Sequence, residues 1–285
     1  MLRDAVEGDH EPSSVGVRPR PGEALELQER RIPLDTAWMK LKDLVLGTAG
    51  RKLITFDDEE LTPVLQQPAS QASIVELERK LGFALPPELR EILTLAAGLD
   101  LVDGGREVDD PIDFACIDRC GHEDLFGWVL TPSTDGAGND WVIELRPDQQ
   151  VLGPVWFLCH DAPVLVYQSP DLATFLADDL RYLQPPHDGP MQHVVEQAVH
   201  DVWTQKLDVP REQLLHSQDP ILRTFANTLP EGWFIRDLRH AKPGDGMPIG
   251  RFGPKTPLAR AGDEFVFAYG SRTRLERLKT FFTGR

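Results

Sequence analysis

Five short apolar segments between residues 111 and 168, joined by short polar links, constrain the fold most. In the first segment, Ile112, Phe114 and Cys116 alternate with Asp113 and Ala115, which is the period of a strand. The other segments are Trp128–Leu130, Trp141–Leu145, Val155–Leu158 and Val164–Tyr167. Consecutive strands with short links pair in an antiparallel meander, because parallel pairing requires long crossovers. We therefore expect an antiparallel sheet with helices on one face.

A pair of helices is predicted just before these strands. Ser73 and Glu76 have the spacing of a capping box at a helix start. Gly82 can take the left-handed conformation that ends a helix, and Pro87 suits the first position of the next one. Gly98 closes the pair. A further helix is expected at Asp35–Leu46, and another is expected to begin at Ser169-Pro170, after the strands.

The order of these features resembles the SUKH superfamily, the Smi/Knr-like family. The matching positions are Ile74, Glu78, Leu81, Gly82, Leu85, Pro86 and Leu89, followed by Asp135–Trp141, Gly153–Val155, His160-Asp161 and Phe175-Leu176. Trp38 matches the aromatic residue often found in the family's first helix. The resemblance covers residues 32–184 and implies an α+β fold, a twisted antiparallel sheet flanked by helices. It carries over neither catalytic nor binding residues, because the family shares none.

The chain is expected to divide into three parts. Residues 1–31 are rich in proline, glycine and charge, and we interpret them as a mobile leader. The SUKH-like domain spans residues 32–184 and ends at the break Pro185-Pro186. Residues 186–285 are predicted to form a small, separate α+β module, which resembles no family that we recognise.

Charge and cysteine content limit the partners and the compartment. The net charge is −16, and residues 230–285 hold 11 Lys and Arg against 6 Asp and Glu, so a charge of −21 remains for residues 1–229. An acidic body repels nucleic acid and anionic membranes and attracts basic proteins. The first residues lack the apolar segment of a secretory signal, and the three cysteines are too few for a disulfide framework. We therefore expect a cytoplasmic protein without nucleic-acid or membrane partners.

One stretch concentrates this acidity. The stretch from Asp100 to Asp124 contains nine acidic residues and two basic ones, and it includes Gly104-Gly105. Glycine-containing loops often carry binding residues, although such a charge run can also be merely a solvated loop. The residues predicted to bind a partner are Asp103, Glu107, Asp109, Asp110, Glu123 and Asp124.

Neither a metal nor a cofactor is expected. Cys116, Cys120 and His122 have the right chemistry for zinc, but their spacing is not a usual zinc pattern, so we interpret the cysteines as structural. His160 and Asp161 could orient a base, but neighbours on a strand point to opposite faces, so we expect no direct pairing.

The tryptophans do not indicate nucleic-acid binding either. Trp128, Trp141 and Trp156 are spaced as residues of a sheet core. A platform for stacking bases also needs basic neighbours, and we expect the neighbours of these tryptophans to be acidic.

Two functions remain, and neither is enzymatic. The resemblance implies a bacterial immunity protein that binds and neutralises a cognate toxin, which we expect to be basic. The alternative is an interaction or adaptor protein of a secretion apparatus or a signalling assembly, as fungal relatives are in cell-wall signalling. An enzyme is disfavoured because the sequence contains no recognisable catalytic motif.

Overall fold

The computed structural model describes residues 41–54, 60–103, 106–107, 112–147, 149–187, 189–205 and 207–270. The chain divides into two compact units, Met1–Pro33 and Leu34–Arg285, and every described residue belongs to the second. The predicted leader, residues 1–31, therefore lies outside the described residues.

Three antiparallel sheets organise the second unit, which confirms the expected α+β fold. The first sheet holds β1 (Leu53–Ile54), β2 (Glu60–Leu65), β3 (Gly98–Asp103), β4 (Arg106–Glu107) and β5 (Ile112–Asp113). The second holds, in order of pairing, β13 (Gly246–Pro248), β10 (Val164–Ser169), β9 (Val155–Cys159), β8 (Asp140–Leu145), β7 (Trp128–Thr134) and β6 (Ile117–Arg119). The third holds β11 (Val209–Pro210), β12 (Trp233–Asp237), β15 (Val266–Gly270) and β14 (Leu258–Arg260). The predicted meander is confirmed for its last four segments, since β7, β8, β9 and β10 pair in chain order. The prediction is wrong for the first segment, because Ile112-Asp113 forms β5 and pairs with β3 in the first sheet, and the strand that pairs with β7 is β6, which begins only at Ile117.

The helices before and after the meander follow local sequence signals. These helices are α2 (Leu41–Thr48), α3 (Gln71–Leu81), α4 (Pro87–Leu95) and α5 (Leu172–Tyr182). Gly82 has φ 82° and ends α3, and Pro87 is the first residue of α4, as predicted. The predicted capping box is wrong, because Ser70 caps α3 and its side chain accepts a hydrogen bond from Ser73 N. Similarly, Asp171 rather than Ser169 caps α5.

Helix α5 covers one face of the six-stranded sheet. It contacts β10, and the Phe175 ring lies 5.8 Å from the Trp141 ring of β8. Trp141 Nε1 donates a hydrogen bond to the buried Gln168 Oε1 of β10. Helix α2 contacts both α4 and α5, so helices from both ends of the SUKH-like region meet on this side.

Residues beyond Pro186 cover the other face of the same sheet. One core cluster joins Cys120, Leu125, Phe126, Val129, Val142, Trp156 and Leu165 to Leu238, Met247, Ile249, Leu258, Phe267 and Tyr269. Trp156 is fully buried, and its ring lies 5.8 Å from Phe267, edge to face. The SUKH-like region and the C-terminal region therefore share one core.

Strand β13 also joins the two regions through the backbone. It pairs with β10 in the register Leu165↔Met247. A Cβ at Gly246 would lie 2.3 Å from Leu165 O, so only glycine permits this approach. Whether residues 32–184 fold alone stays a prediction, but the predicted boundary cuts through a shared sheet and a shared core.

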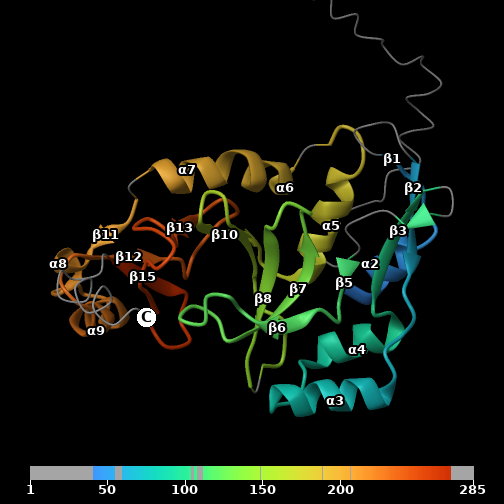
Figure 1. The fold of residues 1–285 in the computed structure, drawn as a ribbon, viewed down its shortest axis with the longest axis horizontal. Coiled ribbons are helices and arrows are strands. Elements are labelled where there is room, and N and C mark those ends of the chain that lie inside the picture. Colours follow the sequence, from blue (N-terminus) through green and yellow to red (C-terminus); the bar gives the residue numbers. More distant parts are fainter. Residues whose placement is uncertain are drawn as a thin grey trace, which may run out of the picture. The chain divides into compact units, whose positions relative to one another are not determined.

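The remaining helices of the C-terminal region lie beside the second sheet or beside the third sheet. They are α6 (Pro190–Gln192), the π-helix η2 (His193–Ala198), α7 (Val199–Thr204), α8 (Arg211–Leu214) and α9 (Pro220–Thr228). Helix α7 runs along β10 and β13 and contacts both strands (Figure 1). Asp219 caps α9, since its carboxylate accepts hydrogen bonds from Ile221 N and Leu222 N.

Candidate functional site

The six acidic residues predicted to bind a partner lie in two different places. The backbones of Asp103 and Glu107 belong to the β3–β4 hairpin of the first sheet. Asp109 and Asp110 lie outside the described residues. Glu123 and Asp124 are exposed between β6 and β7 of the second sheet. These residues therefore stay a prediction, divided between a hairpin of one sheet and a loop of another.

A groove opens where α3 ends beside β6, β7 and β8. Its volume is about 840 Å³, and its lining includes Phe83, Arg119, Trp128, Arg146 and, from the C-terminal region, Asp263. Trp128 is the first residue of β7 and is only half-buried. This side chain was predicted to lie in the core of the sheet, and its partial exposure in a groove corrects that prediction.

Two cations flank the Trp128 ring. The guanidinium carbon of Arg119 lies 4.4 Å from the ring centroid, and Lys80 Nζ lies 5.5 Å from it. Arg119 comes from β6, whose register places it directly opposite Trp128, whereas Lys80 comes from the last turn of α3. The prediction that the tryptophans have acidic neighbours is therefore wrong for Trp128, because pairing between elements places two basic side chains beside it.

The acidic residues of the groove are already paired. Glu144 Oε1 lies 2.6 Å from Arg260 Nη1, and its Oε2 lies 3.5 Å from Arg146 Nε, which is ion-pair distance without hydrogen-bond geometry. Asp263 Oδ1 lies 3.5 Å from Arg146 Nη1. Among the described residues, no carboxylate lies within ion-pair distance of Arg119. The positive charge of Arg119 therefore remains available at the groove surface.

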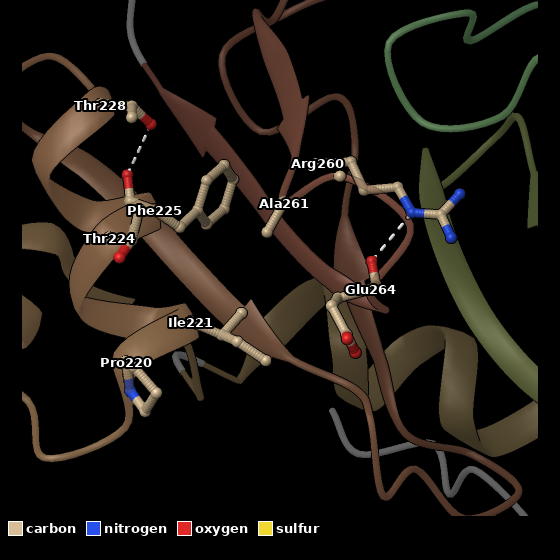
Figure 2. Close-up of a pocket in the computed structure, with 9 residues that line it drawn as sticks. Pro220, Ile221, Thr224, Phe225, Thr228, Arg260, Ala261 and Glu264 are labelled. Carbon is tan, nitrogen blue, oxygen red and sulfur yellow. Dashed lines mark hydrogen bonds between the residues drawn. The ribbon is translucent and has the colours of Figure 1, made fainter.

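A second, mostly apolar pocket of about 530 Å³ lies between α9 and the β14–β15 turn. Figure 2 shows Ile221 and Phe225 of α9 facing Ala261, while the guanidinium of Arg260 points away from them. Thr228 Oγ1 donates to Phe225 O, and Arg260 Nε donates to Glu264 O. The pocket is thus lined mainly by the apolar side chains of Ile221, Phe225 and Ala261.

Residues 68–178 match the SMI1 / KNR4 family (SUKH-1). The match confirms the predicted resemblance over this segment. No curated protein and no solved structure matches the chain.

The SUKH-1 segment contains almost the whole of the groove. The residues that line the groove lie between Leu81 and Gln149, with the exception of Asp263, which belongs to the β14–β15 turn. The same turn contributes Ala261, Gly262 and Glu264 to the apolar pocket. The C-terminal region therefore completes one surface of the SUKH-1 segment and forms a second pocket beside it.

Hydrogen bonds of Asp135 and Asn139 hold the glycine-rich turn of the SUKH-1 segment. Asp135 accepts hydrogen bonds from the backbone amides of Ala137 and Asn139 and from the Asn139 side chain. Asn139 Oδ1 in turn accepts from His160 N. The turn thus connects the β7–β8 hairpin to the end of β9.

His160 and Asp161 do pair directly, contrary to the prediction. His160 Nε2 lies 3.1 Å from Asp161 Oδ1. The two residues lie in the turn after β9 and not within a strand, so their side chains are not held on opposite faces. Both side chains are more than half exposed, and the pair closes a surface turn.

The cysteines differ in exposure. Cys120 and Cys159 are buried, as expected of structural thiols, but Cys116 is exposed because it falls in the bend between β5 and β6. Within the described ranges, no group of three or more His, Cys, Asp or Glu residues is placed to hold a metal ion. In the same ranges, no helix is both long and apolar enough to cross a membrane.

Proposed function

We propose that this chain is a non-enzymatic binding protein that neutralises a cognate toxin, as an immunity protein does. The observation that carries the proposal is the SUKH-1 match over residues 68–178, which runs from just before α3 into α5. The resemblance implies this role because many bacterial members of the superfamily are immunity proteins. We place its action in the cytoplasm.

Charge supports a basic partner. The net charge of −16 raises the local concentration of a basic protein and speeds its encounter with the chain. Asp103, Glu107, Asp109 and Asp110 belong to the stretch that concentrates this charge. We propose that these carboxylates steer the toxin and imitate the phosphates that a nuclease would bind.

Affinity needs more than charge. Exposed ion pairs contribute about 0–1 kcal/mol each, whereas a few anchors in concave sites carry most of the binding energy of an interface. Tryptophan and arginine are the most frequent anchors. Trp128 with Arg119 is such a combination, and it lies in a groove of the SUKH-1 segment.

The test is neutralisation of the protein encoded beside this chain. That neighbour should arrest growth when it is expressed alone in a heterologous host, and co-expression of the full chain should restore growth. The two purified proteins should form a complex in size-exclusion chromatography. A neighbour that is harmless, or that stays toxic in the presence of the chain, would contradict the proposal. If the harmless neighbour is a secretion-apparatus component that binds the chain, the adaptor function replaces the immunity function.

A further inference from the structure

The groove at Trp128 differs in charge from the rest of the molecule. The chain carries −16 overall, yet Arg119 and Lys80 flank the Trp128 ring. A cation held over an aromatic face is attracted by the ring quadrupole, so the ring positions both cations at the groove.

The Trp128 ring orients the Arg119 guanidinium, which does not form an ion pair within the described residues. Its guanidinium carbon is 4.4 Å from the ring centroid, and within the described part of the chain it has no carboxylate partner. Lys80 has only a distant one, Asp118 Oδ1 at 3.8 Å, and both of these side chains are more than half exposed. A guanidinium offers a fork of N–H donors that matches a carboxylate in two parallel hydrogen bonds.

The carboxylates that line the groove are each paired with another arginine. Glu144 is paired with the buried Arg260, and Asp263 is paired with Arg146. Among the described lining residues, Arg119 is therefore the cation left without a carboxylate partner, and an incoming anion can pair with it. Phe83 adds a half-buried aromatic surface beside it.

We propose that this groove binds a carboxylate-bearing loop of a partner protein. The Arg119 guanidinium donates hydrogen bonds to the carboxylate, and Trp128 packs against the loop. The proposal rests on the protein-binding function proposed above and names the chemistry of one contact. A basic partner can present such a loop, since one Asp or Glu among basic residues leaves its overall charge positive.

A nucleic acid fits the groove less well. Each phosphate added beside the first would meet the field of a molecule with a net charge of −16, and polyanion binding depends on many cationic contacts. A short loop brings one or two carboxylates and enough apolar surface to contact Trp128 and Phe83.

The test uses a displayed library of short random peptides, selected against the full chain. Peptides that bind at the groove should be enriched in Asp or Glu next to an apolar residue. A selected peptide, labelled with a fluorophore and measured by anisotropy, should lose about tenfold or more in affinity with Arg119→Glu or with Trp128→Ala.

Two controls separate recognition from general effects. Lys255→Glu makes the same charge change as Arg119→Glu at an exposed position that does not line the groove, and it should leave peptide affinity unchanged. Arg119 is exposed, so Arg119→Glu should unfold in urea with the same midpoint as the unaltered chain. Arg119→Glu used as the target of a fresh selection should enrich Lys- or Arg-containing peptides instead.

Three binding results, and one neutralisation result, would overturn the inference. The first is a selection from the unaltered chain without enrichment of Asp or Glu. The second is an equal loss of affinity with Lys255→Glu and with Arg119→Glu. The third is tight binding of a labelled single-stranded oligonucleotide that Arg119→Glu abolishes, which would assign the groove to nucleic acid. If the Arg119→Glu variant neutralises the neighbouring toxin as well as the unaltered chain does, the groove is not a contact site for the toxin. That result would leave the proposed immunity function intact.

Discussion

Arg260 Nη1 lies 2.6 Å from Glu144 Oε1, although 116 positions separate these two residues in the chain. The side chains are 6% and 11% exposed, so the ion pair is almost fully buried. Arg260 also donates to Leu125 O, and its guanidinium lies 5.1 to 5.5 Å from the ring centroids of Phe126, Phe265 and Phe267. One side chain of β14 thus connects the third sheet to the SUKH-1 segment.

Arg260→Ala is expected to reduce the free energy of unfolding by about 3–5 kcal/mol, because the buried Glu144 charge loses its hydrogen-bonded partner and keeps only Arg146, 3.5 Å from its Oε2. Urea denaturation followed by fluorescence measures this change. The exposed pair of Lys42 with Glu91 supplies the control, and Lys42→Ala should have little effect.

A double substitution separates the cost of an orphaned charge from the value of the pair. Replacing both members, as Arg260→Met with Glu144→Leu, should recover much of the stability lost in Arg260→Ala, since hydrophobic residues of similar volume often replace a buried ion pair without loss. If the double variant is as unstable as the single one, the hydrogen bonds of Arg260 to the backbone are what stabilise the junction.

Local signals explain which parts of the fold the sequence predicts. Gly82 ends α3 and Pro87 begins α4 because each residue has a backbone preference that acts within one turn. The meander follows from apolar segments joined by short links. The cap of α3 was misplaced by three residues because Ser70 and Ser73 are both suitable capping residues, and only the backbone geometry distinguishes them.

Non-local pairing explains what the sequence does not predict. Strand β13 joins β10 across a gap of about eighty residues, and Gly246-Met247-Pro248 has no strand pattern of its own. The groove was missed for the same reason, since Lys80 and Arg119 meet Trp128 only after α3 and β6 are in place. The sequence does contain one indication of the groove. Trp128 is the first residue of its apolar segment, and residues at the ends of strands are less completely buried than those in the middle.

The shared core leads to a prediction about the C-terminal region. A chain that ends at Gln184 loses β13 and uncovers Trp156, Phe126 and Leu165, which are buried in the full chain. We expect this fragment to aggregate or to unfold without cooperativity, because an exposed apolar sheet face is not stable in water. A cooperative urea transition for the fragment would instead support the predicted division into two domains.

The Asp135 turn predicts a pH dependence. Burial alone would raise the pKa of Asp135, but hydrogen bonds from the Asn139 side chain and from backbone amides outweigh it, so the pKa lies below its ordinary value of 3.8. A lowered carboxyl pKa gives stability that is present above pH 3.8 and is lost as the pH falls through the folded-state value. Asp135→Asn should therefore cost about 1 kcal/mol at neutral pH, and this difference should shrink in acid.

Urea titrations at a series of pH values measure this dependence for Asp135→Asn and the unaltered chain. Glu231→Gln, at an exposed position between α9 and β12, is the control and should be as stable as the unaltered chain at neutral pH. A constant gap between Asp135→Asn and the unaltered chain down to strongly acidic pH would show that the carboxylate charge does not stabilise the turn.

The two proposed surfaces should act on different rates of partner binding. Long-range charge changes the association rate and its salt dependence, whereas a desolvated anchor changes the dissociation rate. Replacing Asp103, Glu107, Asp109 and Asp110 together with Asn or Gln should therefore slow association with the partner and make the association rate less dependent on salt.

Trp128→Ala should leave the association rate nearly unchanged and speed dissociation by about tenfold or more. Surface plasmon resonance with the identified toxin across a salt series measures both rates. If the quadruple variant associates as fast as the unaltered chain at low salt, the acidic stretch is only solvated, and Trp128 and Arg119 remain as the candidate contact.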